Sequence, residues 1–156
     1  MLHPAVQLFL DFGSRLPSDS HIDSSVYLRS NTSSATGGKY DVFAHTSNGP
    51  LDFSVLDAPV DHTLALDAQT SNVGARVSLH KTFEGSFDLQ SSRWFRPTIE
   101  WDKDVEDPAG KDRTRSVELH NIRPGSAQGN AWWEKGNENK GSAKVVTSNA
   151  PVRLQL

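Results

Sequence analysis

The stretch KVVTSNAPVRLQL, residues 144–156, places the triplet Thr-Ser-Asn between two segments in which apolar and polar residues alternate. The same triplet occurs at residues 46–48 and 70–72. Ser and Asn are common in turns, because their short side chains bond to nearby backbone groups and Asn tolerates positive φ. Each triplet is therefore predicted to be a structural turn between two strands, with the turn asparagines Asn48, Asn72 and Asn149.

The residues on both sides of each triplet keep one register. Five, seven and nine positions past the Thr all nine residues are apolar, and so are the six residues two and four positions before it. Period-two alternation of this kind indicates strands with one buried face. The predicted core residues are Val42, Ala44, Leu51, Phe53, Val55, Leu66, Ala68, Ala75, Val77, Leu79, Ala143, Val145, Val152, Leu154 and Leu156.

The recurrence of strand, triplet and strand predicts a repetitive fold. Thr46 and Thr70 are 24 residues apart, within the range of one structural repeat. No apolar pattern with helical spacing persists for three turns. We therefore predict one all-β domain over residues 1–156 with a β-solenoid or β-helix-like fold, and a β-sandwich is the alternative.

Two segments interrupt the repeat. Residues 100–115 read EWDKDVEDPAGKDRTR, with six acids and four bases between strand-like flanks. They predict a charged loop insertion at about residues 102–115. Residues 130–146 read NAWWEKGNENKGSAKVV, which predicts a C-terminal hairpin with GNENKG at its tip.

Three stretches carry a family resemblance: HTSNGPLDFSV, residues 45–55; LDAQTSNVGARVSLHKTFEGSFDLQSS, residues 66–92; and VVTSNAPVRLQL, residues 145–156. Together they resemble an uncharacterised fungal domain family, which is in turn similar to bacterial adhesin-like β-solenoid proteins. The resemblance runs from about Val26 to Leu156 and implies a repetitive β fold. It implies no catalytic residues, and the adhesin-like label is not itself an activity.

Composition excludes several classes of function. The chain has no cysteine, so disulfides, thiolate metal sites and cysteine nucleophiles are excluded. A net charge of -3 gives no basic footprint for nucleic acid. The apolar AVQLFL, residues 5–10, is interpreted as a strand rather than a signal peptide, and no apolar run is long enough to span a bilayer. The compartment stays open, with the cytoplasm favoured.

No catalytic motif is present, and no cofactor or metal is indicated. The six histidines, His3, His21, His45, His62, His80 and His120, lack the spacing of a zinc site. The acids that begin at Asp102 fail as a calcium loop, because Asp107 stands where Gly belongs and Arg113 where a Glu belongs. A metal or catalytic site assembled from distant strands stays open as an alternative.

Paired aromatic residues are the candidate ligand or interface residues: Trp132 with Trp133, and Trp94 with Phe95. Consecutive residues of a strand face opposite sides, so one of each pair is expected in the core and one outside. We predict a non-catalytic module that binds a protein or glycan, or that forms a homo-oligomer. The alternatives are a carbohydrate-binding lectin, and an enzyme whose histidines and carboxylates meet in a cleft.

Overall fold

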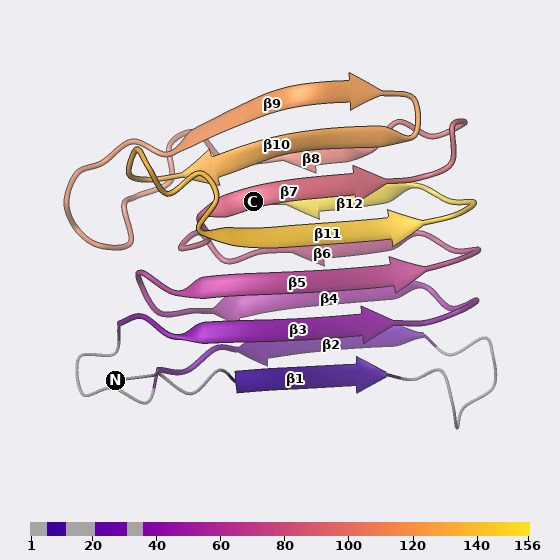
Figure 1. Cartoon of the computed structure of the whole chain (residues 1–156), viewed down its shortest axis with the longest axis horizontal. Helices are drawn as coiled ribbons and strands as arrows, with labels where there is room; N and C mark the ends of the chain where they lie inside the picture. The colour runs from indigo at the N-terminus through magenta and orange to yellow at the C-terminus, as the bar shows by residue number, and fades with distance from the viewer. Residues whose placement is uncertain (1–5, 12–20, 31–35) are drawn as a thin grey trace.

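The structure, a computed structural model, describes residues 6–11, 21–30 and 36–156, and for residues 6–11 it describes the backbone alone. The described residues form two β-sheets and no helix (Figure 1), so the all-β prediction is confirmed. The seven-stranded sheet contains, in spatial order, β1 (Val6–Asp11), β3 (Lys39–His45), β5 (Thr63–Thr70), β11 (Gly141–Thr147), β7 (Gly85–Gln90), β10 (Ser126–Trp132) and β9 (Ser116–Arg123). The five-stranded sheet contains β2 (Ile22–Tyr27), β4 (Leu51–Asp57), β6 (Ala75–Ser78), β12 (Val152–Gln155) and β8 (Thr98–Glu100).

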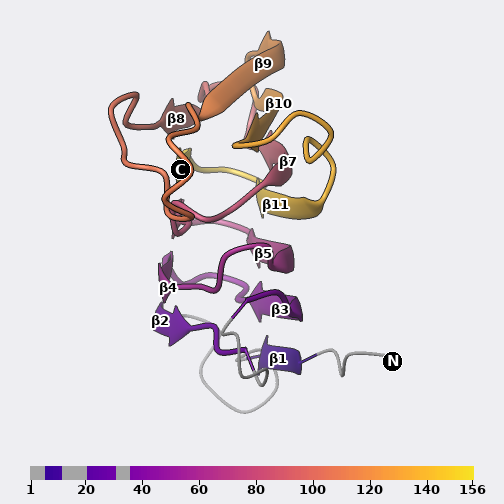
Figure 2. The same cartoon turned by 90° about the vertical axis from the view of Figure 1, so that its left-hand side faces the viewer.

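The two sheets face each other, and the chain passes repeatedly from one to the other. Figure 2 shows the sheets as two neighbouring stacks of strands. β3, β5 and β11 of the seven-stranded sheet are followed by β4, β6 and β12 of the other, and each pair is joined through a Thr-Ser-Asn triplet. All strand pairs are parallel except those that involve β10.

The space between the sheets is the core. All fifteen apolar residues that the triplet register predicts as inward-facing are buried. Phe53 of β4 and Leu154 of β12, which follow two different triplets, are 1% and 0% exposed. Burial of a side chain of this size contributes about 1.5–3 kcal/mol, so the shared interior accounts for much of the driving force for stacking.

The triplets stack on one another at one end of the sheets. The side-chain amide of Asn72 donates to Oδ1 of Asn48, and that of Asn149 donates to Oδ1 of Asn72 at 2.8 Å. Behind this ladder of three asparagines, the Thr70 hydroxyl donates to the Gly49 carbonyl at 2.9 Å. The triplets therefore change the chain direction while their asparagine side chains bond to the neighbouring turn.

The strands do not stack in chain order. β11 lies between β5 and β7, and β12 lies between β6 and β8. Ala143 of β11 is opposite Leu66 on one side and Phe87 on the other. Where β11 meets β7, Gly85 and Gly141 are in register, and a Cβ atom at Gly85 would overlap the Gly141 backbone. The segment 141–156 is thus inserted into the middle of a stack that the earlier chain forms.

The predicted C-terminal hairpin is wrong. β10 and β11 flank the same strand, β7, and β10 instead forms a hairpin with β9. Gly125 has a φ of 82°, which supplies the positive value in the tight turn after Pro124. The physical reason is that the inward-facing residues of β11 are in register with those of β5 and β7, which lie parallel to it on either side. This long-range pairing, rather than proximity in the chain, determines the neighbours of β11.

The charged segment that was predicted as an insertion, residues 102–115, lies in the connection between β8 and β9 and contains no strand. The residues that the structure describes include no helix able to cross a membrane.

Candidate functional site

The molecule has two dissimilar ends. The triplets and the connection between β7 and β8 lie at one end, and other loops lie at the opposite end (Figure 1). These other loops include residues 58–62, 79–84, 101–115 and 133–140. Each end carries one group of side chains whose arrangement can serve binding.

At the triplet end, the residues 91–97 form a corner that we call the Trp94 corner. Trp94 is 78% exposed and Phe95 is 40% exposed, so neither aromatic lies in the core. The Phe95 carbonyl accepts the Ser91 hydroxyl at 2.7 Å and the Gly125 amide at 3.1 Å. The backbone that carries the exposed rings is therefore held from both sides.

Beside the Trp94 corner, no strand of the five-stranded sheet among the described residues lies beyond β8 to cover this edge of the core. Figure 2 shows β9 rising beyond β8, the last strand of the five-stranded sheet. The groove between them has a volume of about 340 Å³, and Ile122 at its edge is 48% exposed. We call this groove the open end; it is lined by Arg96, Pro97, Thr98, Ile99, Leu119, Ile122 and Ala127.

Three exposed arginines lie in the segments that form this surface: Arg93 and Arg96 in the Trp94 corner, and Arg123 at the end of β9. The Arg93 guanidinium lies 4.8 Å from the centre of the Trp94 ring, which is a cation–π contact. None of the three forms an ion pair with another described residue. Although the net charge of the chain is -3, this surface is locally cationic.

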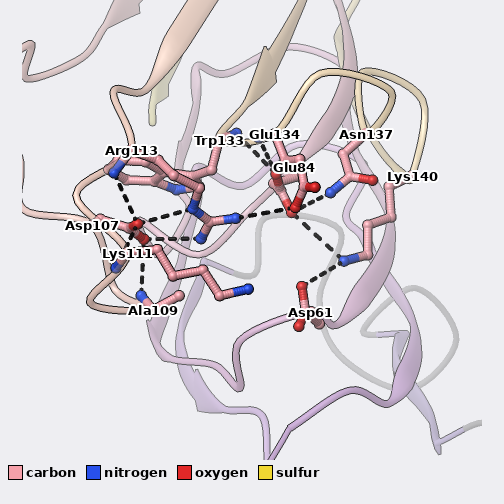
Figure 3. A network of polar contacts seen from close by, with 10 residues as sticks. All are labelled: Asp61, Glu84, Asp107, Ala109, Lys111, Arg113, Trp133, Glu134, Asn137 and Lys140. Carbon is pink, nitrogen blue, oxygen red and sulfur yellow. Dashed lines mark hydrogen bonds and ion pairs between the residues drawn. The ribbon is translucent and has the colours of Figure 1, made fainter.

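At the opposite end, a buried carboxylate holds the loop 133–140 in place (Figure 3). Glu84 is 4% exposed. Its Oε1 accepts the backbone amides of Trp133 and Glu134 at 2.8 and 3.1 Å. Its Oε2 accepts the Asn137 amide at 3.0 Å and lies 3.6 Å from Nζ of Lys140. Every bond of this carboxylate is internal, which is the pattern of a structural group.

The charged loop contains a second internal pair, between Asp107 and Arg113 (Figure 3). The guanidinium donates twice to the carboxylate, at 2.9 Å each, and the Asp107 side chain is only 3% exposed. Arg113, helped by the backbone amides of Ala109, Arg113 and Lys111 and opposed by burial, holds the pKa of Asp107 well below its usual value. The segment expected to be an exposed charged loop is thus folded around one of its own acids.

Trp132 and Trp133 differ from the first aromatic pair. Trp133 is 5% exposed, and its indole N–H donates to the Lys81 carbonyl at 2.7 Å. Arg115, also buried, lies with its guanidinium 5.9 Å from the Trp133 ring. Trp132 is half-buried at the end of β10. Of the four candidate aromatics, the structure therefore leaves Trp94 and Phe95 on a free surface.

The histidines are distributed over the molecule. His62 and His80 lie at the loop end, where burial lowers the pKa of each. His62 is buried and its Nδ1–H donates to the Pro59 carbonyl at 2.8 Å. His21, His45 and His120 lie beside Asp52, Asp67 and Glu118, at 3.5, 3.5 and 3.8 Å. His3 lies outside the described residues, and no group of three or more His, Asp or Glu side chains in the described part could hold a metal ion.

The chain matches no protein-family model, no curated protein and no solved structure.

Sequence reasoning missed the arginines of the open end and the role of Glu84. The end of β9, which carries Arg123, lies beside the Trp94 corner because the Gly125 amide in the following turn donates to the Phe95 carbonyl, 30 positions away. For Glu84, the only signal in the sequence is a single acid between Phe83 and Gly85. The structure shows that the residues around it are buried.

Proposed function

We propose that the protein is a non-catalytic β-solenoid module that binds a partner protein at the open end of its core. The solenoid interpretation is supported by parallel pairing within both sheets and by triplets that carry the chain from one sheet to the next. A sandwich built from hairpins would be mainly antiparallel. The resemblance to adhesin-like β-solenoid proteins points the same way.

The observation that carries the binding function is the exposure of Trp94 on a fixed corner. Trp, Phe and Arg are enriched at protein interfaces, and Trp and Arg dominate their hot spots. Here a Trp that is 78% exposed lies under Arg93 and beside an apolar groove. Large aromatics are rarely left in water on a well-ordered corner unless a partner covers them.

The partner that fits is a protein segment with one or two apolar side chains flanked by acids. The apolar side chains would enter the groove between β8 and β9, and the acids would meet Arg93, Arg96 and Arg123. Such complementarity sets specificity and association rate. A twofold contact of two open ends would place these arginines against their own copies, so a second copy is disfavoured as the occupant of this surface.

A phage-displayed peptide selection on the immobilised protein tests this proposal. We expect enrichment of sequences that combine acidic and apolar residues. Binding of the enriched peptides should weaken about 10-fold or more in Trp94→Ala, the size of a typical hot-spot loss. It should also weaken in Arg93→Glu and as salt is raised, since exposed charges are screened.

Tyr27 supplies the matched control. It is 58% exposed and lies 5.5 Å beneath Arg29, so it repeats the aromatic–arginine pair at another place. Tyr27→Ala should leave peptide binding unchanged. No enrichment of acidic sequences, or equal losses in Tyr27→Ala and Trp94→Ala, would reject the proposal. Sedimentation of the free protein tests the predicted homo-oligomer separately.

A carbohydrate ligand is the second candidate, because an exposed indole can also stack on a sugar ring. A glycan array with the wild type and Trp94→Ala distinguishes the two. Saturable binding of a neutral glycan that is lost in Trp94→Ala would favour the lectin, and peptide binding without glycan binding would favour the protein partner.

A further inference from the structure

A pocket at the loop end lies apart from the open end and concerns a different ligand. It has a volume of about 620 Å³, enough for a small metabolite. We call it the Lys81 pocket; it is lined by residues 28–30, 57–60 and 80–82 and by Pro108. None of these residues belongs to the open end. A ligand-binding role of this pocket is therefore independent of the proposed binding function at the open end.

The charged groups of the pocket leave one cation uncompensated. Arg29 and Asp57 form an ion pair at 3.3 Å, and their charges cancel. Lys81 forms no ion pair with any other described residue. The ammonium of Lys81 is therefore the charge that a ligand can compensate.

His80 adds a directed hydrogen-bond donor. The backbone amide of Thr82 can only donate, and it lies 3.4 Å from Nδ1 of His80; the Thr82 hydroxyl lies 2.8 Å from the same nitrogen. We assign Nδ1 as the acceptor of the Thr82 amide, which places the proton of the neutral ring on Nε2; the Thr82 hydroxyl can donate to Nδ1 or to the Ala58 carbonyl at 3.4 Å. This N–H has no partner in the part of the chain that the structure describes.

A second cation, Arg115, lies near the pocket, and the carboxylate of Glu84 partly offsets its charge. Its side chain is buried and one Nη donates to the Phe83 carbonyl at 3.3 Å, but Nε has no hydrogen-bond partner among the described residues. Burial lowers the pKa of Arg115 to about 10, so it remains charged at neutral pH. Burial lowers the pKa of His80 most, Asp57 opposes this effect, and Lys81 and Arg115 lower the pKa further. Lys81 and Arg115 are therefore the cations close to His80, and Asp57 is the opposing charge.

We propose that the Lys81 pocket binds a small molecule through an oxyanion, either a carboxylate or a phosphate. Lys81 supplies the opposing charge, the Nε2–H of His80 donates a hydrogen bond, and Arg115 adds a positive charge nearby. The apolar residues Leu28, Ala58 and Pro59 line the remaining wall and would contact the uncharged part of the ligand.

Amide chemical shifts of the full chain, followed during titration with inorganic phosphate and, separately, with acetate, test this proposal. Sodium chloride at equal ionic strength supplies the baseline. We expect saturable shifts confined to the amides of Asp57, Ala58 and Val60 and of residues 80–82. Saturation by phosphate alone assigns a phosphate ligand, and saturation by both anions assigns a general oxyanion site; either result supports the pocket.

Three variants at the site and one control complete the test. Lys81→Gln should weaken the apparent Kd about 10-fold, as loss of one charge-assisted hydrogen bond predicts. His80→Phe should also weaken it, whereas His80→Gln, which keeps a donor, should not. Lys144→Ala, an exposed lysine on β11, should bind as the wild type does. Linear shifts without saturation, the same shifts with chloride, or an equal loss in Lys144→Ala would overturn the proposal.

Discussion

Asn149 donates its side-chain amide to Oδ1 of Asn72 at 2.8 Å, although 77 positions separate the two residues. Asn72 in turn bonds to Asn48, so one residue bridges turns from three separate parts of the chain.

The central asparagine should matter more than those at the ends. Asn72→Ala removes two side-chain bonds and should lower the free energy of unfolding by about 1–2 kcal/mol, since each such bond contributes roughly 0.5–1.5 kcal/mol. Asn48→Ala and Asn149→Ala remove one bond each and should cost about half as much. Urea unfolding measures all three. Equal losses would show that the ladder is not a connected unit.

Two adjacent valines test the register of β11. Val145 is 0% exposed, whereas its neighbour Val146 faces outward and is half-buried. Val145→Ala should lower the free energy of unfolding by about 2 kcal/mol, because it leaves a cavity in a closed core. Val146→Ala should cost well under half of that. If the losses are reversed, the inward face of β11 has been assigned to the wrong residues.

Replacing Asp107 should destabilise the protein in a manner that depends on pH. The pKa of Asp107 lies below its usual value of 3.8, chiefly because of Arg113. Its charge therefore stabilises the fold above the unfolded pKa, and this contribution is lost as pH falls towards the folded one. Asp107→Asn should cost about 1–2 kcal/mol at pH 7, the order of a bond to a charged group.

The difference between Asp107→Asn and the wild type should shrink as pH is lowered below 3.8. Unfolding monitored by circular dichroism across this range measures it. The control is Asp104→Asn, an exposed acid of the same loop, which should follow the wild type at every pH. A loss that is independent of pH would contradict the assigned ion pair.

Glu84→Gln should loosen the loop 133–140. The amide can keep the two backbone bonds of Glu84, but it loses the charge opposite Lys140 and turns a donor towards the Asn137 amide. Hydrogen exchange at the Trp133 and Glu134 amides should accelerate by about 10-fold or more, as a loss of roughly 1.5–3 kcal/mol at a bond to a charged group implies. Glu118→Gln, on exposed β9, should leave these rates unchanged.

His62 should make the protein less stable in mild acid. Burial lowers its pKa from 6.5, so the unfolded chain binds the proton more readily than the folded one. The free energy of unfolding is therefore unaffected by His62 above pH 6.5, and it decreases as the pH falls below this value. His62→Gln should flatten the pH dependence of urea unfolding between pH 7.5 and 5.5, a window set by the unfolded pKa. His21→Gln, which changes an exposed histidine, should not.

Which residues of each strand face the core could be predicted from sequence, but which strands lie next to each other could not. Alternation around each triplet identifies Val42, Leu66 and Ala143 as core residues because side-chain direction follows from local spacing. The order of the strands depends on long-range pairing. Leu66 and Phe87 each fit beside Ala143, and the same register would also let β5 and β7 pair directly. The sequence pattern is equally compatible with β11 between β5 and β7 and with β5 beside β7. Its prediction that β10 and β11 form a hairpin was wrong.

The candidate site was predictable only in part. The pair Trp94 and Phe95 could be singled out as adjacent aromatics, but the rule that one faces inward fails there, because they lie on a corner rather than in a strand. The cationic residues near Trp94 and Phe95 could not be predicted, because Arg123 belongs to a separate hairpin, formed by β9 and β10. The same holds for the Lys81 pocket, where His80 and Arg29 meet from loops that are distant in the chain.

The insertion of β11 and β12 also constrains how the protein is made. A ribosome completes β7 and β8 before it produces residues 141–156, which separate those strands from β5 and β6 in the folded molecule. During translation, a premature contact between Leu66 and Phe87 must therefore open again or be prevented. The nascent chain consequently acquires its final strand order only after the inserted segment has left the exit tunnel.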